Sequence, residues 1–255
     1  MCLILFAWQV HPDYPLVVAA NRDEWRERPA ASAAWWDDAP DILAGRDLEA
    51  GGTWLGITRS GRFAAITNFR DPSDRKSTAP SRGRLVADFL RGNAPPRDYL
   101  DTLAANASRY NGFNLLLADE KSMCYFGSRE GNIVDVAPGI HGLSNHLLDE
   151  PWPKVEKGKS ALNKAFEAKM AGTPLLERSF TILSDTAPVA DEALPDTGVG
   201  LEWERVLSPA LIVTEKYGTR CSTVLLRSRQ EIVFEERTRG VSGEVALSSA
   251  FRFAF

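Results

Sequence analysis

The first third of the chain is a series of short apolar runs, each followed by turn residues. Runs of five or six residues are too short for ordinary helices and favour buried β-strands. A short turn ending in Gly61, a residue that tolerates positive φ, separates the last two runs, so we expect them to form a β-hairpin. The four predicted strands cover residues 3–8, 16–20, 54–58 and 63–67.

The rest of the chain alternates between helical and strand patterns. Helices are predicted over residues 85–91, 99–104 and 154–170, the last of which follows Pro153, a residue suited to a first helical turn. Residues 185–200 concentrate Asp, Pro and Gly and predict a surface loop. This order, without a regular repeat, predicts an α+β fold in which helices cover sheets. The further predicted strands cover residues 113–118, 123–126, 133–136, 222–226 and 232–235.

Length, charge and cysteine content narrow the class of protein. The 255 residues suit a single domain, 1–255, and a net charge of −4 argues against nonspecific nucleic-acid binding. The basic stretch at 75–84 is short and broken, which favours a solvated loop over an anion site. Cys2, Cys124 and Cys221 have no paired spacing and favour a reducing, cytoplasmic location. The apolar opening is too short to cross a bilayer, and the sequence carries no signal of an oligomeric state.

Cys2 directly follows the initiator Met1. Removal of Met1 leaves a free α-amino group beside a thiol. Because the pKa of an α-amino group is about 7.7 to 8.0, this group can serve as the base that activates the thiol as a nucleophile. A cysteine at this position is also compatible with a small buried hydrophobic residue.

Four polar residues follow the second apolar run: Asn21, Arg22, Asp23 and Glu24. If the strand continues, Arg22 and Glu24 point to one face, whereas Asn21 and Asp23 point to the other. An arginine near Cys2 lowers the pKa of the thiol, and a carboxylate near the α-amino group orients it. A surface salt bridge or a turn at the strand end is the structural alternative.

Six motifs occur in one order along nearly the whole chain. Through them the sequence resembles the NRDE family, also called the transport and Golgi organization protein 2 family. The motifs are Met-Cys at 1–2, Asn-Arg-Asp-Glu at 21–24, Gly-Gly-Thr-Trp-Leu-Gly at 51–56, Tyr-Asn-Gly-Phe-Asn-Leu at 110–115, Gly-Leu-Ser-Asn at 142–145 with Pro-Trp at 151–152, and Tyr-Gly-Thr-Arg at 217–220 leading into Thr-Val at 223–224.

The resemblance implies a four-layer αββα sandwich of two antiparallel sheets flanked by helices, similar to N-terminal-nucleophile hydrolases of the penicillin V acylase and bile acid amidase type. In those amidases a cysteine attacks the carbonyl, while an arginine and an aspartate hold the nucleophile. By resemblance, Cys2 and Arg22 take the first two roles. The carboxylate role falls to Asp23 or Glu24, because the spacing of the amidases leads to Trp25 in this chain.

The same resemblance suggests further site residues. Asn68 and Asn145 are candidates for stabilising an oxyanion, with capping of a strand end or turn as the alternative. Arg220 is a candidate clamp for a substrate carboxylate or a second neighbour of the thiol, with a structural salt bridge as the alternative. Asn21 and Glu24 are assigned to substrate binding.

Two tryptophans complete the predicted substrate site. Trp54 lies in a glycine-rich stretch that lacks the Lys-Ser/Thr of a P-loop, so its glycines indicate close backbone approach, with Trp54 in the core or lining a pocket. Trp35 lines an apolar pocket or packs against a surface loop. The histidines lack metal-ligand spacing, so we expect no metal and no cofactor, with axial haem ligation by His141 or His146 as the alternative.

Two functions follow as expectations. The first is a cysteine hydrolase that cleaves an amide, or a thioester, of an acyl substrate through an acyl-Cys2 intermediate. The second is a non-catalytic binding or trafficking protein for haem, acyl-coenzyme A or a lipid-like ligand, because members of the family are linked to lipid metabolism and haem homeostasis and a fold does not determine a function.

Overall fold

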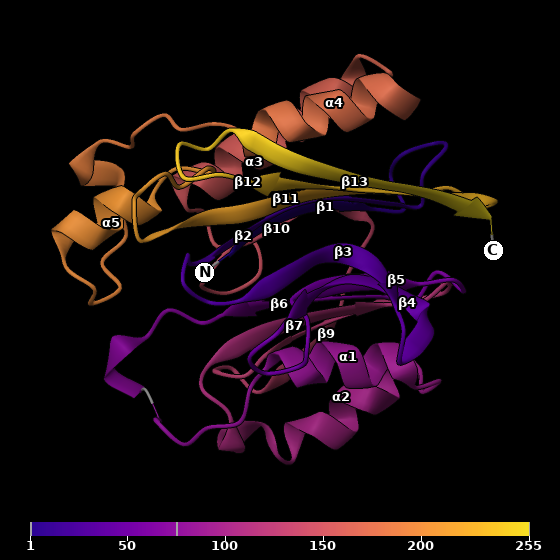
Figure 1. Cartoon of the computed structure of the whole chain (residues 1–255), viewed down its shortest axis with the longest axis horizontal. Coiled ribbons are helices and arrows are strands. Elements are labelled where there is room, and N and C mark those ends of the chain that lie inside the picture. The colour runs from indigo at the N-terminus through magenta and orange to yellow at the C-terminus, as the bar shows by residue number, and fades with distance from the viewer. Residues whose placement is uncertain (1, 75, 255) are drawn as a thin grey trace. The chain divides into compact units, whose positions relative to one another are not determined.

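The computed structural model describes residues 2–74 and 76–254. Within them the chain forms two compact units, one of residues 2–27, Pro138–Ser144 and Leu148–Phe253, the other of Arg28–Ala137 and Asn145–Leu147, followed by Ala254. We call these the first and second unit. Each contains one antiparallel sheet with helices packed on it (Figure 1). The α+β class with two antiparallel sheets flanked by helices is therefore confirmed.

The first unit contains a six-stranded sheet with strand order β10-β1-β2-β11-β12-β13. Helices α3 (Pro153–Glu167) and α4 (Gly172–Leu183) pack on it, and α5 (Leu201–Leu207) precedes β11. The strands are β10 (Gly139–Leu143), β1 (Cys2–Trp8), β2 (Leu16–Trp25), β11 (Tyr217–Arg227), β12 (Glu231–Arg239) and β13 (Val245–Ala254).

The second unit contains a seven-stranded sheet in sequence order, β3 to β9. Helices α1 (Gly83–Arg91) and α2 (Pro96–Ala104) pack on it. The strands are β3 (Ala30–Trp36), β4 (Ala39–Asp47), β5 (Leu55–Thr58), β6 (Phe63–Asn68), β7 (Phe113–Ala118), β8 (Met123–Gly127) and β9 (Asn132–Asp135). Short 3₁₀ helices lie at Pro72–Asp74, Ala107–Arg109 and Asp191–Ala193.

The alternation of side chains along β1 determines which residues face the helices. Leu3 and Leu5 belong to a buried cluster with Val155 of α3 and Phe180 of α4. Burying side chains of this size stabilises the fold by about 1.5–3 kcal/mol each. Because successive residues of a strand point to opposite faces, Cys2 lies on the face opposite to α3 and α4.

The predicted strands and helices are present, with some changes of boundary. The hairpin of β5 and β6 is confirmed, and Gly61 at its turn has a φ of +77°. Helix α3 ends at Glu167 rather than at residue 170, and Trp54 precedes β5 instead of starting it. The single domain over residues 1–255 stays a prediction. Among the described residues no helix is long and apolar enough to span a membrane.

Four strands and two helices were not predicted: β3, β4, β10, β13, α4 and α5. Strand β13 is exposed or half-buried along its length, so it shows no buried apolar run. Strand β3 is rich in alanine, which has little preference for strands. Helix α4 begins at Gly172 with Pro174 in its first turn, and its stability comes from apolar packing against the sheet.

Candidate active site

Cys2 is the first residue of β1 and lies directly opposite Arg22 of β2. Directly opposed residues of an antiparallel pair point to the same face of the sheet, so the thiol and the guanidinium group share one face. The main-chain carbonyl of Cys2 accepts a 3.1 Å hydrogen bond from the Ser144 hydroxyl, which follows β10. The start of β1 is therefore held on both sides, by β2 and by the residue after β10.

The four polar residues at 21–24 alternate between the two faces of the sheet, as the two-residue period of a strand predicts. Arg22 and Glu24 share the face of Cys2, and their side chains approach to 3.9 Å. The amide nitrogen of Asn21 points to the opposite face, where it donates to the carbonyls of Leu183 and Ala210 at 2.8 and 2.7 Å. These two bonds tie β2 to the end of α4 and to the segment before β11, and they engage both N–H donors of the Asn21 amide.

Asp23 is buried and accepts a 2.7 Å hydrogen bond from the hydroxyl of Thr219. The same hydroxyl accepts from the main-chain N–H of Ile212 at 2.9 Å, which orients its proton toward Asp23. Since β1 and β2 are antiparallel and Cys2 opposes Arg22, Asp23 lies on the amino side of Cys2. Of the two candidate carboxylates, Asp23 is thus the one beside the position of the α-amino group.

The Cys2 thiol has a raised pKa. Burial is the largest cause, and the carboxylate of Asp23 raises the pKa further, whereas Arg22 and a hydrogen bond from the main-chain N–H of Asp23 lower it. The sequence led us to expect a thiol pKa lowered by Arg22; Arg22 does act in that direction, but burial outweighs it. The resting sulfur is therefore a thiol, and attack on a carbonyl requires a base.

Arg220 lies in a β-bulge of β11, where the register with β2 shifts between Thr219 and Cys221. Its guanidinium donates to the carbonyl of Trp25 at 2.9 Å. Burial, followed by the charges of Arg22 and Arg26, lowers the pKa of Arg220. Because a bulge inserts an extra residue and re-aims a side chain, it sets this cation among the other arginines at the end of β2.

The two oxyanion candidates meet each other in the second unit. Asn68 ends β6, and its main-chain carbonyl accepts a 2.9 Å hydrogen bond from the amide of Asn145. The carbonyl of Asn145 accepts from the N–H of Arg70 at 2.7 Å. Asn145 is fully buried, and its Oδ1 has no hydrogen-bond partner among the described residues.

The two tryptophans assigned to substrate binding also belong to the second unit. The guanidinium of Arg59, in the β5–β6 turn, stacks on Trp35 at 3.8 Å from the ring centroid, so Trp35 packs against a loop. The ring of Trp54 lies over Gly45, where a Cβ atom would come within 2.3 Å of it. A side chain at Gly45 would thus collide with the indole, and this packing accounts for the position of Trp54.

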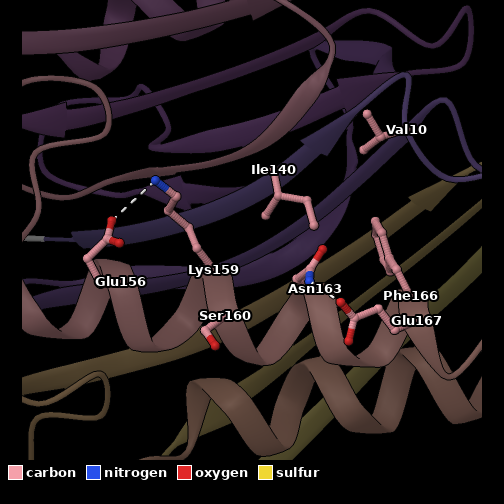
Figure 2. Close-up of a pocket in the computed structure, with 8 residues that line it drawn as sticks. All are labelled: Val10, Ile140, Glu156, Lys159, Ser160, Asn163, Phe166 and Glu167. Atoms are coloured by element: carbon pink, nitrogen blue, oxygen red, sulfur yellow. Dashed lines mark hydrogen bonds and ion pairs between the residues drawn. The ribbon is translucent and has the colours of Figure 1, made fainter.

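The pocket in Figure 2 lies in the first unit, between helix α3 and the edge strand β10, with a volume of about 500 Å³. Its lining includes Ile140, Val10 and Phe166, and Lys159 pairs there with Glu156 at 3.2 Å. None of its lining residues is a candidate site residue, so this pocket gives no support to the Cys2 site.

The alternative haem ligands are engaged in local contacts. His141 contacts Asp149 through Nδ1 at 2.7 Å and stacks on Phe6, with 5.2 Å between the ring centroids. His146 stacks on Phe69 with centroids 4.9 Å apart. Among residues 2–74 and 76–254, no group of three His, Cys, Asp or Glu side chains is arranged to hold a metal ion.

Four residues that contact the candidate site residues or lie beside them in the sheet were not assigned roles from the sequence: Ser144, Thr219, Cys221 and Glu236. Ser144 and Thr219 lie inside the motifs at 142–145 and 217–220, so their positions were available as a signal. Cys221 and Glu236 carry no local signal, because their proximity depends on the pairing of β2, β11 and β12.

Among solved structures, the chain is similar to an N-acylethanolamine-hydrolyzing acid amidase ortholog from Caenorhabditis elegans, with 8% identity, a TM-score of 0.47 and coverage of 88% of this chain and 92% of the other. It is also similar to a mutant of conjugated bile acid hydrolase from Clostridium perfringens, with 10% identity, a TM-score of 0.46 and coverage of 100% and 96%.

Curated relatives match most of the chain. The Transport and Golgi organization protein 2 homologs of Bos taurus and Homo sapiens are 38% and 36% identical, each over 93% of this chain and 93% of the relative. The Drosophila melanogaster Transport and Golgi organization protein 2 is 30% identical over 93% of this chain and 92% of its own length. The family model described as Transport and Golgi organisation 2 matches residues 1–240. The chain therefore belongs to the Transport and Golgi organisation 2 family.

Proposed function

We propose that this protein is a cysteine N-terminal-nucleophile hydrolase that cleaves an amide, or a thioester, of an acyl substrate through an acyl-Cys2 intermediate. The observation that carries the proposal is the arrangement at the start of β1: the thiol of Cys2 opposes the buried Arg22, and the buried carboxylate of Asp23 lies on its amino side. The three cysteines have no disulfide partners among the described residues, which supports a cytoplasmic location.

The raised pKa of Cys2 explains why a base is needed. After removal of Met1, which lies outside the described residues, the α-amino group takes the thiol proton as the sulfur attacks the carbonyl carbon. The bond to the leaving group breaks, and the α-ammonium group returns its proton to that group. Water then attacks the acyl-thioester with the amine as base, the carbon–sulfur bond breaks, and the thiol is regenerated.

Each neighbouring residue has a defined part in this proposal. Arg22 favours the thiolate by its charge, and Asp23 orients the α-amino group as a hydrogen-bond acceptor. Arg220 provides a second cation at the same end of β2 and β11, suited to a substrate carboxylate. Oxyanion stabilisation by Asn68 and Asn145, and contacts of Asn21, Glu24, Trp54 and Trp35 with substrate, stay predictions.

The test is turnover of acyl substrates by purified protein whose intact mass shows loss of Met1. A panel of N-acyl amides and acyl-coenzyme A thioesters is compared between the natural protein and Cys2→Ala, with Cys124→Ala as the control. We expect hydrolysis of at least one substrate, its loss in Cys2→Ala, and a transient acyl adduct on the Cys2 peptide by mass spectrometry. Turnover that survives in Cys2→Ala contradicts the proposal.

We propose a second candidate for protein that retains Met1, because the raised pKa then leaves Cys2 as a resting thiol without its base. In that case the protein binds haem, acyl-coenzyme A or a lipid-like ligand. Titration with haem and acyl-coenzyme A tests this function directly. Saturable binding that persists in Cys2→Ala, without turnover, supports it, and no binding at micromolar protein excludes it.

A further inference from the structure

Glu236 is a carboxylate buried within the six-stranded sheet. It lies on β12, one strand in from the edge strand β13, and is 2% exposed. Carboxylates are almost never fully buried unless a hydrogen bond or an opposite charge compensates the loss of water. The position of Glu236 therefore calls for a compensating partner within the sheet.

The register of three strands places Glu236 on the face of Cys2. Glu236 opposes Thr223 of β11, and Cys221 lies two residues before Thr223 and so shares its face. Cys221 in turn opposes Arg22 of β2, which opposes Cys2 of β1. Cys2, Arg22 and Cys221 thus form one row across the sheet, and Glu236 lies in the adjacent row beside Cys221.

Two polar contacts show where the carboxylate points. The hydroxyl of Thr223 donates to Oε2 of Glu236 at 3.3 Å. The thiol of Cys221 also forms a hydrogen bond with the Glu236 side chain. Since Cys221 comes before Thr223 along β11, both contacts direct the carboxylate toward β11, the strand that separates it from Arg22.

The charges of Arg22 and Glu236 both act on the pKa of the Cys221 thiol. Burial raises the pKa of Cys221 well above its usual value, Glu236 raises it further, and Arg22 acts in the opposite direction. Arg22 and Glu236 lie on β2 and β12, the strands on the two sides of Cys221. Arg22 is 5% exposed, and its contact with the partly exposed Glu24 is long, at 3.9 Å. Opposite charges that are both buried on one face of a sheet lower each other's cost of burial.

We propose that Glu236 is the buried counter-charge that holds the guanidinium of Arg22 in position beside Cys2. Glu236 is then a positioning residue that acts on the nucleophile through Arg22. This inference rests on the proposed function of Cys2. The pairing of Arg22 with Glu236 can nevertheless be tested without turnover, because it depends only on the charged groups on one face of the sheet.

Alkylation of Cys2 as a function of pH tests the proposal without any substrate. Iodoacetamide is the reagent, and mass spectrometry of the Cys2 peptide separates its reaction from those of the other cysteines. The variants are Glu236→Gln, Arg22→Met and their combination, with Glu231→Gln at the far end of β12 as the matched control. Circular dichroism verifies that each variant is folded.

We expect Glu236→Gln to raise the midpoint of Cys2 alkylation toward that of Arg22→Met, because a released Arg22 no longer stabilises the thiolate. The combined variant should have the midpoint of Arg22→Met alone, and Glu231→Gln should match the natural protein. A lower midpoint in Glu236→Gln overturns the proposal, because Glu236 would then act only as a nearby negative charge. An unchanged midpoint overturns it as well.

Thr223→Val is a second variant for the case in which Glu236→Gln does not fold. It removes the hydroxyl that orients the carboxylate and leaves both charges in place, so a smaller rise of the midpoint is expected, and no rise contradicts the proposal. The outcome is independent of turnover. If no acyl substrate is hydrolysed, the proposed function fails while the coupling of Arg22 and Glu236 is still measured.

Discussion

Cys2 and Arg22 are directly opposed across the antiparallel pair of β1 and β2. The pairing continues to Cys221 of β11, so a single cation lies between two cysteines on one sheet face. Arg22 lowers the pKa of both thiols, yet burial leaves both pKa values above the usual range. The thiols of Cys2 and Cys221 therefore resemble each other in the direction of their pKa shifts. They differ in position, because Cys2 is the first residue of β1 whereas Cys221 lies within β11.

The α-amino group is the first target for a test. Protein produced while methionine aminopeptidase is inhibited retains Met1, so the nitrogen of Cys2 stays in a peptide bond and cannot act as a base. We expect turnover to fall at least about 100-fold in this form, the size of a typical general-base contribution. Trimming with the purified aminopeptidase should restore turnover, with intact mass as the check. Full activity with Met1 in place would exclude the α-amino mechanism.

The two neighbouring carboxylates should behave differently. Asp23 raises the pKa of Cys2, so Asp23→Asn is expected to lower the pH midpoint of Cys2 alkylation, while turnover falls because the α-amino group loses its acceptor. The substitution also weakens the bond from Thr219, at a cost of about 1.5–3 kcal/mol in unfolding free energy.

Glu24→Gln is the matched control for Asp23→Asn. Glu24 is 25% exposed and contacts Arg22 at 3.9 Å, so its neutralisation should leave the alkylation midpoint of Cys2 nearly unchanged. A larger effect of Glu24→Gln than of Asp23→Asn would reassign the carboxylate role to Glu24.

Gly52 should be intolerant of a side chain. A Cβ atom there would lie 2.4 and 2.5 Å from the carbonyl carbon and oxygen of Gly83, main-chain atoms that cannot rotate away. We expect Gly52→Ala to lower the unfolding free energy by about 2–3 kcal/mol. At Gly92 the nearest atom to an added Cβ lies at 3.3 Å, so Gly92→Ala should cost less than about 1 kcal/mol. Urea denaturation measures both, and equal losses would contradict the close-approach interpretation.

The ionisation of Asp149 should make the free energy of unfolding depend on pH in the acidic range. Burial opposes its charged form, but hydrogen bonds from His141, the N–H of Gly142 and Lys159 outweigh burial, so the pKa of Asp149 lies below its usual value. A folded-state pKa below the unfolded value of about 3.9 stabilises the fold at higher pH, and this contribution is lost as the pH falls through the folded pKa. Asp149→Asn should therefore be less stable at neutral pH, and the difference should shrink below about pH 4.

The measurement for Asp149 is urea unfolding of the natural protein and Asp149→Asn between pH 3 and pH 7. Asparagine keeps the size of the side chain, so a difference that changes with pH belongs to the ionisation. A difference of constant size across this range would show that Asp149 acts through packing alone.

Local periodicity accounts for how the polar residues of β2 are divided between the two faces of the sheet. The two-residue repeat of a strand separates Arg22 and Glu24 from Asn21 and Asp23, and the structure has this arrangement. The β5–β6 hairpin is likewise encoded locally, by the glycine in its turn, Gly61. These features depend on neighbours a few residues apart, whose geometry the covalent chain restricts.

The sequence by itself therefore determined the class of fold, the main strands and helices, the family motifs and Cys2 with its polar tetrad. Only the tertiary structure decided that Arg22 lies between Cys2 and Cys221, that Thr219 holds Asp23, and that Glu236 faces the same surface. It also decided that burial outweighs Arg22 in setting the pKa of Cys2. The physical reason is distance along the chain: strand pairing brings together residues about 200 positions apart, and no local pattern encodes which strands will pair.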